Sequence, residues 1–474
     1  MAQYDLLVIG SGPAGQKAAV QAAKLGKTVG IIERKAVVGG VSTNTGTIPS
    51  KALREAVLYL SGFRQRNLYG TGYRLKETIT IEDLAFRANH VIKNEIEIVK
   101  DQMARNQIDL IYGDASFIDP HRLLVQQAGT STEHYAHVIV VAVGTVPTRP
   151  ADIPFDGYTI IDTDGLVTLK HLPKSMVIVG GGVIGTEYAS ILAMIGVPVT
   201  LIDKRPRLLE FVDFQIIEAL QRQMADIGVT LCHEEEVVAI RKESDGQVTV
   251  SLTHRPPITT TTLMYAIGRI GATKRLNLEA VGIKPDARGR VIVNDHFQTA
   301  VPHIYAAGDV IGFPALASTS MQQGRHAACH AFGHPDHTDT DLLPYGIYAI
   351  PEISMVGRNE EDLSKAEIPY AVGIAHYREI ARGQLTGDET GMLKLLFHRH
   401  TRTLLGVHAI GEGATEIIHI GQAVMAYKGK IDYFVDTVFN YPTLTECYKV
   451  AALDGINRLP RPWPGQTTGV KREA

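Results

Sequence analysis

The stretch LLVIGSGPAGQKAAVQAAKLGKTVGIIE, residues 6–33, decides the fold. An apolar run of strand length, residues 4–9, leads into the glycine-rich turn of residues 10–15, and a helix-forming segment follows. Gly26 can end that helix, and residues 28–32 form a second apolar run before Glu33. This order predicts a βαβ unit whose turn and helix N-terminus face the pyrophosphate of a dinucleotide. The carboxylate of Glu33 can accept hydrogen bonds from ribose hydroxyls.

The same pattern recurs 170 positions later in the chain. Residues 176–179 are apolar, GGGVIG follows at residues 180–185, and residues 199–202 form the next apolar run. Five landmarks coincide in one register: Gly10 with Gly180, Gly12 with Gly182, Gly15 with Gly185, Gly26 with Gly196, and Glu33 with Asp203. We therefore predict two Rossmann-like domains that hold two dinucleotides at once.

The remainder of the chain predicts a third domain of different type. Residues 372–407 alternate like antiparallel strands, residues 415–428 and 445–458 are helical in pattern, and no fingerprint occurs among them. The fold class is thus α/β, with two dinucleotide-binding domains and a C-terminal α+β domain. The predicted boundaries are 1–150 for the first nucleotide domain, 151–268 for the second, 269–343 for a central part that completes the first, 344–460 for the α+β domain and 461–474 for a tail. The tail is expected to be disordered or draped over the surface.

Composition excludes several classes of function. The chain has 474 residues, 45% of them hydrophobic and 20% charged, and a formal net charge of -3, so neither nucleic acid nor a membrane is an expected partner. Cys232, Cys329 and Cys447 share no CxxC spacing, which argues against a metal site and against a local redox pair. Reduced cysteines and the lack of a basic segment at the start predict a cytoplasmic protein. The longest apolar region, residues 176–202, contains five glycines and Glu187 and is a poor membrane span.

The segment GGVSTNTGTIPSK, residues 39–51, resembles the redox-active segment of the flavoprotein disulfide reductases. In that family two cysteines five positions apart lie against the flavin, and here Ser42 and Thr47 stand at those positions. The resemblance covers nearly the whole chain, in order and in spacing. The motifs that carry it are GSGPAG, IPSK, AVGTVP, GGGVIGTE, AIGR, YAAGDV and YPTLTE.

The resemblance implies FAD in the first fingerprint domain, NAD or NADP in the second, and a homodimer formed by the C-terminal domain. It implies that Lys51 pairs with Glu187 near the flavin, where a cation stabilises the negative charge that the ring gains on reduction. It also implies that Asp309 contacts the ribityl chain. The implied FAD contacts are Gly10, Gly12, Pro13, Ala14, Gly15, Glu33, Arg34, Gly39, Gly40, Val41, Ser42, Thr47, Lys51, Ala115, Gly144, Gly308, Asp309 and Ala317. The implied NAD(P) contacts are Gly180, Gly182, Val183, Ile184, Gly185, Glu187, Asp203, Lys204, Arg205, Arg207 and Gly268.

The chain departs from that family at its thiols and at their base. Disulfide reductases end with a His-Pro pair and a glutamate, and here Tyr441 stands in the histidine position while Glu446 is retained. Tyrosine, with a pKa of about 10, is a poor proton shuttle for a thiol near neutral pH. The candidate catalytic residues are Lys51, Glu187, Tyr441 and Glu446. Glu446 has an alternative role in ordering the turn at Pro442.

Further stretches, among them GTIPSKALREAV, IYAIPEISMVG and EIIHIGQAV, resemble the soluble, Si-specific pyridine nucleotide transhydrogenases. That branch implies hydride transfer between NADPH and NAD+ through tightly bound FAD, in a ping-pong mechanism without a redox-active disulfide. NADPH, NADH, NAD+ and NADP+ would exchange at one site. The alternatives are an FAD-dependent NAD(P)H:quinone or dye oxidoreductase, and a non-enzymatic FAD-bearing nucleotide sensor.

Four side-chain questions remain open in the sequence. Asp203 can bond a free ribose diol, and the cluster Lys204, Arg205 and Arg207 can meet a 2′-phosphate, although each cation taken singly also fits a solvated basic turn. Ser42 and Thr47 can bond flavin or backbone, and Thr47 is equally suited to capping a helix. His419 fits a core or interface position. Tyr348, Tyr441 and Tyr448 fit packing in a dimer.

Overall fold

The computed structural model describes residues 2–70, 72–335 and 342–459, which form two compact units. The first unit comprises the described parts of residues 1–63, 73–209 and 224–340, and the second those of residues 64–72, 210–223 and 341–474. The predicted tail, residues 461–474, lies outside the described residues. The predicted domain boundaries stay predictions.

The first unit contains a seven-stranded sheet in the order β3-β2-β1-β6-β5-β4, with β17 paired to β6. Its strands are β1 (Ala2–Ile9), β2 (Val29–Glu33), β3 (Asp109–Tyr112), β4 (Asp114–Asp119), β5 (Arg122–Gln127), β6 (Thr130–Val141) and β17 (Ile304–Ala306). Strand β1 runs parallel to β2 and β6, and Leu6 and Leu7 are buried in different core clusters. Burial in two clusters explains why residues 6–9 of β1 are continuously apolar rather than alternating.

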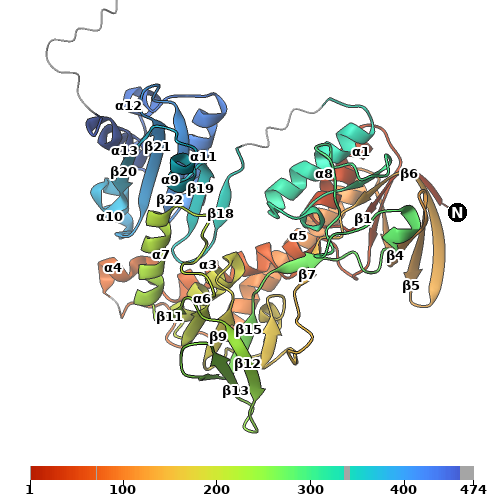
Figure 1. Cartoon of the computed structure of the whole chain (residues 1–474), viewed down its shortest axis with the longest axis horizontal. Helices are drawn as coiled ribbons and strands as arrows, with labels where there is room; N and C mark the ends of the chain where they lie inside the picture. The colour runs from red at the N-terminus through yellow and green to blue at the C-terminus, as the bar shows by residue number, and fades with distance from the viewer. Residues whose placement is uncertain (1, 71, 336–341, 460–474) are drawn as a thin grey trace, which may run out of the picture. The chain divides into compact units, whose positions relative to one another are not determined.

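Two helices cover the first of these clusters. Helices α1 (Pro13–Lys24) and α8 (Ala317–Ala331) lie side by side (Figure 1). Their approach is close, because a Cβ placed on Gly324 of α8 would lie 2.0 Å from the carbonyl oxygen of Ala14 in α1. This contact joins the first fingerprint to a segment three hundred residues further along the chain.

The second fingerprint lies on a parallel sheet in the same unit, in the order β11-β10-β9-β15-β8. Its elements are β8 (Ile160–Asp162), β9 (Met176–Val179), α6 (Val183–Met194), β10 (Val199–Ile202), β11 (Val229–Cys232) and β15 (Thr262–Tyr265). The antiparallel sheet of β12 (Val237–Lys242), β13 (Val248–Leu252) and β14 (Ile258–Thr260) packs on it. Residues 245–246 lie in the hairpin turn between β12 and β13.

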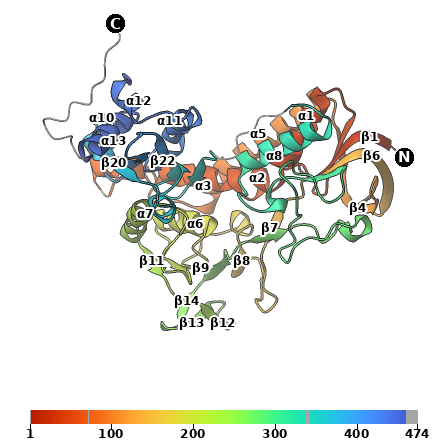
Figure 2. The same cartoon turned by 45° about the horizontal axis from the view of Figure 1, so that its top comes forward.

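Short connecting elements complete the first unit. Strands β7 (Thr145–Pro147) and β16 (Arg269–Gly271) form an antiparallel ribbon. Helices α3 (Thr47–Leu60) and α5 (Ile81–Arg105) run alongside each other, as Figure 2 shows. A further helix, α2 (Gly40–Asn44), precedes α3.

The second unit contains an antiparallel sheet in the order β18-β19-β22-β21-β20. Its strands are β18 (Tyr345–Ile347), β19 (Ile353–Gly357), β20 (Tyr370–His376), β21 (Met392–His398) and β22 (Leu404–Ile410). Its helices include α4 (Arg66–Tyr69), α9 (Glu360–Lys365), α10 (Ala381–Thr386), α11 (Ala414–Ala426), α12 (Asp432–Asp436), α13 (Glu446–Asn457) and most of α7 (Phe214–Asp226). The predicted α+β pattern is confirmed.

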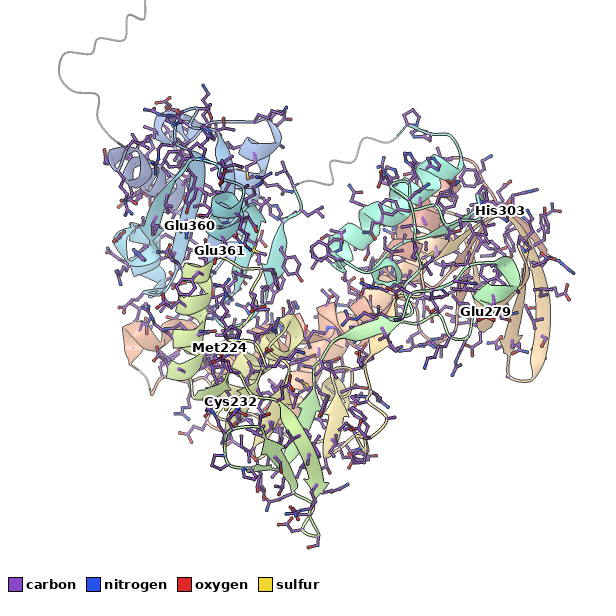
Figure 3. The ribbon with its side chains drawn as sticks, in the orientation of Figure 1. Met224, Cys232, Glu279, His303, Glu360 and Glu361 are labelled. Atoms are coloured by element: carbon purple, nitrogen blue, oxygen red, sulfur yellow. The ribbon has the colours of Figure 1, made fainter. Side chains whose placement is uncertain are left out.

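A buried charge cluster in the second unit explains why residues 210–223 belong to it. The Nζ atom of Lys394 in β21 lies 2.8 Å from Oδ2 of Asp213, and the two side chains are each 1% exposed. Lys394 also pairs with Glu360, which Figure 3 places at the start of α9. Breaking a buried pair on one side leaves an uncompensated charge, so this cluster ties the start of α7 firmly to the sheet.

Candidate functional site

The two fingerprint turns have the same backbone geometry. Gly10 and Gly180 have φ angles of 106° and 110°, and a Cβ on Gly15 or Gly185 would lie 1.9 or 2.0 Å from the carbonyl oxygen of Gly10 or Gly180. Each turn opens a helix of 12 residues, and no side chain caps either N-terminus in the described part of the chain. The repeat predicted from the 170-residue offset is therefore confirmed in three dimensions.

The acidic residue at the end of the second strand of each βαβ motif hydrogen-bonds the glycine turn of that motif. Oε2 of Glu33 accepts hydrogen bonds from the backbone N (3.2 Å) and the Oγ (2.6 Å) of Ser11. In the second copy, Oδ2 of Asp203 accepts from the backbone N of Gly181. Both carboxylates thus lie beside a glycine turn, where Rossmann domains bind ribose. Their contact with ribose stays a prediction.

Two glycine substitutions in the second turn should have different consequences. Gly182 has a negative φ, and no described atom lies within 4 Å of a Cβ built on it, so Gly182→Ala should fold normally. The added methyl group should hinder a pyrophosphate and raise the KM for nicotinamide nucleotides by about 10-fold, leaving FAD content unchanged. Gly185→Ala should lower the free energy of unfolding by about 1–3 kcal/mol, because its Cβ overlaps the Gly180 carbonyl. Equal KM values for wild type and Gly182→Ala would contradict a pyrophosphate at this turn.

Three glycine turns converge at the N-terminus of α1. The backbone N of Gly39 donates to Oγ of Ser11 at 3.0 Å, and a Cβ on Gly40 would lie 2.9 Å from Cα of Gly12. A Cβ on Gly308 would lie 3.0 Å from Cβ of Ala14. Backbone N–H groups and a helix N-terminus gathered this closely form the donor set that a diphosphate requires. These residues fit the pyrophosphate of FAD.

Asp309 is the carboxylate of this group of turns. Burial raises the pKa of Asp309, whereas the positive charge of Arg269 and a hydrogen bond from Ser320 (3.3 Å) lower it. A half-buried carboxylate that accepts a long hydrogen bond from Ser320 fits the hydroxyl donors of a polyol chain such as the ribityl chain of FAD. Its position is therefore consistent with the predicted contact, which stays a prediction.

Sequence reasoning assigned no role to Arg269. Its Nε donates to Oγ1 of Thr145 at 2.9 Å, and its Nη1 lies 2.7 Å from Oδ1 of Asp164. The guanidinium therefore fastens β16 to β7 and also lies within electrostatic range of Asp309. The AIGR motif was the available signal, but a motif alone does not show which strands an arginine joins.

The segment of residues 39–51 forms two consecutive helices. Helix α3 begins at Thr47, its N-cap is Gly46, and no side-chain cap is found among the described residues, so a capping role for Thr47 is wrong. Pro49 lies in the first turn of α3, where its missing N–H has no cost. Ser42 lies in α2, and Oγ1 of neighbouring Thr45 is buried without a described partner. The segment keeps a defined shape without a disulfide.

Lys51 and Glu187 form the ion pair that the resemblance predicts. Nζ of Lys51 in α3 lies 2.9 Å from Oε1 and 2.7 Å from Oε2 of Glu187 in α6. The Glu187 side chain is 5% exposed and that of Lys51 is 25% exposed. A carboxylate buried to this degree needs a cationic partner, which fixes the ammonium group where α3 meets the second fingerprint helix, α6. Its catalytic role stays a prediction.

The basic cluster after β10 is not uniformly solvated. Arg205 donates through Nε to Oδ1 (2.8 Å) and through Nη2 to Oδ2 (2.7 Å) of Asp203, so a solvated basic turn is wrong for Arg205. Burial opposes ionisation of Asp203, but the bonds from Arg205 and Gly181 outweigh it and lower the pKa of Asp203. Lys204 is exposed and Arg207 is half-buried. A contact of Lys204 and Arg207 with a 2′-phosphate stays a prediction.

The C-terminal candidates have different environments within the second unit. Tyr441 is 74% exposed, and Glu446 begins α13 with its Oε2 buried and without a partner among the described residues, so Oε2 does not order the turn at Pro442. Tyr448 is fully buried, and its hydroxyl donates to the carbonyl of Ile417 at 2.7 Å. Packing of Tyr448 in a dimer is therefore wrong. His419 is exposed rather than in the core.

The other predicted contacts fall at turns and element ends of the first unit. Gly144 (φ 64°) follows β6, and Gly268 (φ 111°) precedes β16. Arg34 follows β2, and the residues at the first or second position of an element are Pro13, Val41, Ala115, Val183, Ile184 and Ala317. Contacts of these residues with a nucleotide stay predictions.

The three cysteines, all of which the structure describes, are buried and free of disulfides. Burial raises the pKa of Cys232, and burial with the charge of Glu446 raises the pKa of Cys447 to about 12. Among the described residues, no group of three or more metal-ligating side chains could hold an ion. No described helix combines the length and apolar character needed to cross a membrane.

Comparisons with known proteins agree with this geometry. Residues 4–324 match the family described as pyridine nucleotide-disulphide oxidoreductase, and residues 343–452 match its dimerisation domain. A soluble pyridine nucleotide transhydrogenase of Mycobacterium tuberculosis is 53% identical over 97% of this chain and 98% of its own. A protein of the same name from Vibrio cholerae is 45% identical over 96% and 98% of the two chains. The solved structure of the flavoprotein disulfide reductase RclA from Escherichia coli matches with a TM-score of 0.85 at 27% identity, covering 95% and 99% of the chains.

Proposed function

The chain belongs to the pyridine nucleotide-disulphide oxidoreductase family, and on that premise we propose that it transfers a hydride from NADPH to NAD+ through FAD. The first fingerprint would hold FAD and the second would hold the nicotinamide nucleotides in turn. One combination of observations carries the proposal. The Lys51–Glu187 pair of the family frame is intact, while Ser42 and Thr47 stand where thiols would be needed.

Different residues of the chain would bind FAD and assist the hydride transfer. FAD, when bound, supplies the chemistry of accepting a hydride from one nicotinamide and giving it to another. The α1 N-terminus would bind its pyrophosphate, and Asp309 would bind its hydroxyls. Lys51, held by Glu187, would keep a positive charge beside the reacting ring and favour hydride arrival.

Without thiols, the second nucleotide has to bind where the first one left. This requirement predicts a ping-pong mechanism, in which NADP+ dissociates before NAD+ binds. We expect steady-state rates measured against NADPH at several NAD+ concentrations to give parallel double-reciprocal lines. Intersecting lines would contradict a single shared nucleotide site. Faster turnover with a quinone than with NAD+ would instead support the quinone reductase alternative.

Thiol reagents should not affect the activity. The raised pKa of about 12 leaves a thiolate fraction of roughly 10⁻⁴ at Cys447 near pH 8, and all three cysteines are buried. Activity should therefore survive iodoacetamide, and mass spectrometry should find three modifications only after denaturation. Rapid inactivation that follows the alkylation of one native cysteine would contradict hydride transfer without thiols.

A cytoplasmic location, tight binding of FAD and a homodimer complete the proposal. The match of residues 343–452 to a dimerisation domain supports the assembly. Tyr441 and Glu446 lie in that domain, and Glu446 presents a buried oxygen without a described partner. We propose that these two residues act at the nucleotide site only in the assembled protein.

A further inference from the structure

The turn between β11 and β12 carries a histidine that the roles described above do not use. His233 follows β11 directly, and both ring nitrogens are buried without a hydrogen-bond partner among the described residues. A buried polar atom without a partner lowers the stability of the fold. Two such atoms on one imidazole indicate that water or a ligand completes its hydrogen bonding.

Backbone hydrogen bonds fix this turn against the start of the basic cluster. The backbone N of Asp203 donates to the carbonyl of Cys232 at 2.9 Å, and that of Glu235 donates to the carbonyl of Asp203 at 3.2 Å. Figure 3 shows Cys232 at the end of β11, one residue before His233. Because β10 and β11 are adjacent and parallel, His233 and Asp203 leave the sheet at the same edge.

That edge is where the adenosine part of a dinucleotide binds. In open α/β sheets ligands lie outside the carboxyl ends of the strands, and the acidic residue after the second strand marks the adenosine ribose. Asp203 is that residue in the second fingerprint domain. His233 therefore stands beside the expected position of the 2′ substituent, which is a hydroxyl in NAD(H) and a phosphate in NADP(H).

We infer that His233 is a specificity-determining residue that hydrogen-bonds the adenosine 2′ substituent, as imidazolium to a phosphate and as neutral imidazole to a hydroxyl. This inference rests on the proposed function only in assigning nicotinamide nucleotides to the second site. An imidazole both donates and accepts hydrogen bonds and changes charge near neutral pH. One side chain can thus serve two nucleotides that differ by a dianion.

Burial favours the neutral ring of His233 until a phosphate arrives. Burial lowers the pKa of His233, and so does the positive charge of Arg255, whereas Asp203 and Glu234 raise it. Arg255 is partly engaged, since its Nη1 lies 3.3 Å from Sγ of Cys232 and its Nε lies 3.8 Å from Oε1 of Glu235.

Two further charged groups near this turn, Arg205 and His254, already have carboxylate partners. The guanidinium of Arg205 is held by both oxygens of Asp203. His254, with a side chain that is 73% exposed, has its Nδ1 3.9 Å from Oε1 of Glu235. A phosphate dianion would therefore be the strongest new charge near His233, and its binding should raise the pKa of that ring.

The direction of this pKa shift determines how phosphate binding depends on pH. If the pKa of His233 is higher in the complex, the affinity for a 2′-phosphate is full below the pKa of the free protein. It falls as the pH rises through the pKa of the complex. Binding near neutral pH should take up a proton. A ligand with a 2′-hydroxyl should show neither effect.

Calorimetry on the full-length, FAD-loaded protein tests this with probes that contain no nicotinamide. Adenosine 2′,5′-bisphosphate and 5′-AMP would be titrated at about pH 7.5, where a phosphate monoester with a pKa of ~6 is already a dianion. Buffers of different ionisation enthalpy give the number of protons taken up. We expect uptake of a sizeable fraction of one proton with the bisphosphate and none with 5′-AMP.

Variants test whether His233 takes up the proton when the bisphosphate binds. His233→Gln should bind the bisphosphate about 10-fold more weakly, the loss expected for one charge-assisted hydrogen bond, and without proton uptake. Its unchanged affinity for 5′-AMP would show that the site is still folded. The matched control His254→Gln should behave as the wild type, because that ring is exposed.

Three results would overturn the inference. They are unchanged bisphosphate affinity and proton uptake in His233→Gln, no bisphosphate binding by the wild type, and loss of 5′-AMP binding in both His233→Gln and His233→Asn. The last result would show a structural role. Neither probe carries a nicotinamide, so the calorimetry tests the role of His233 independently of hydride transfer. Failure of the proposed hydride transfer would not change the binding result, and failure of the binding prediction would not exclude hydride transfer.

Discussion

Lys51→Met should slow hydride transfer from NADPH by about 100- to 1,000-fold, the loss measured when one preorganised electrostatic group is removed from an active site. Both oxygens of Glu187 hold the ammonium group in place, so the charge is preorganised before the reaction. Stopped-flow measurement of flavin bleaching by NADPH checks the rate directly. The KM for NADPH should change much less than kcat.

Two further variants separate this effect from folding. Lys51→Met leaves Glu187 as a buried charge without its ammonium partner, so Lys51→Met/Glu187→Gln should recover stability without recovering the rate. Lys93→Met, a change at an exposed lysine in α5, is the matched control and should retain the wild-type rate. A Lys51→Met rate within about threefold of the wild type would remove Lys51 from the catalytic site.

Lys204→Glu/Arg207→Glu should raise the KM for NADPH by about 100-fold or more while changing the KM for NADH by less than about threefold. Each lost charge-assisted contact to a phosphate is worth about 1.5–3 kcal/mol, and reversal adds repulsion. Arg205 is omitted because its guanidinium is bonded to Asp203, and its loss would disturb the binding of both nucleotides. Steady-state kinetics with each nucleotide checks the prediction.

The control for that variant reverses two exposed lysines elsewhere in the first unit. Lys170→Glu/Lys174→Glu changes the net charge equally but lies outside the fingerprint domains' glycine turns. It should leave both KM values unchanged. Equal increases of the KM values for NADPH and NADH in Lys204→Glu/Arg207→Glu would show that the cluster does not recognise the 2′-phosphate.

The repeated βαβ unit was predictable because its determinants are local. Gly10 and Gly180 need positive φ angles, and Gly15 and Gly185 need the absence of a Cβ, so the sequence pattern follows directly from the backbone. Strand β9 and strand β10 have the predicted ends for the same reason. The Lys51–Glu187 pair was predictable only from the family resemblance, since the two residues are separated by 136 positions.

The remaining features depend on tertiary contacts that no local pattern specifies. Residues 40–44 are mostly polar but form helix α2, which packs on α3 and α5. The hydroxyl of Tyr448 is buried because it bonds α11, and Arg205 turns back to Asp203 because a buried carboxylate is next to it. A role for His233 could not be predicted from the sequence, because it depends on two buried ring nitrogens that have no hydrogen-bond partner among the described residues.

The most direct test of the central claim is a single turnover without oxygen. The FAD-loaded protein would be bleached with one equivalent of NADPH under anaerobic conditions, freed of NADP+ and then mixed with NAD+. Hydride transfer without thiols predicts prompt return of the oxidised flavin spectrum with one equivalent of NADH, and no reduction of lipoamide. A spectrum that stays bleached with NAD+, or recovers with lipoamide instead, would contradict the account.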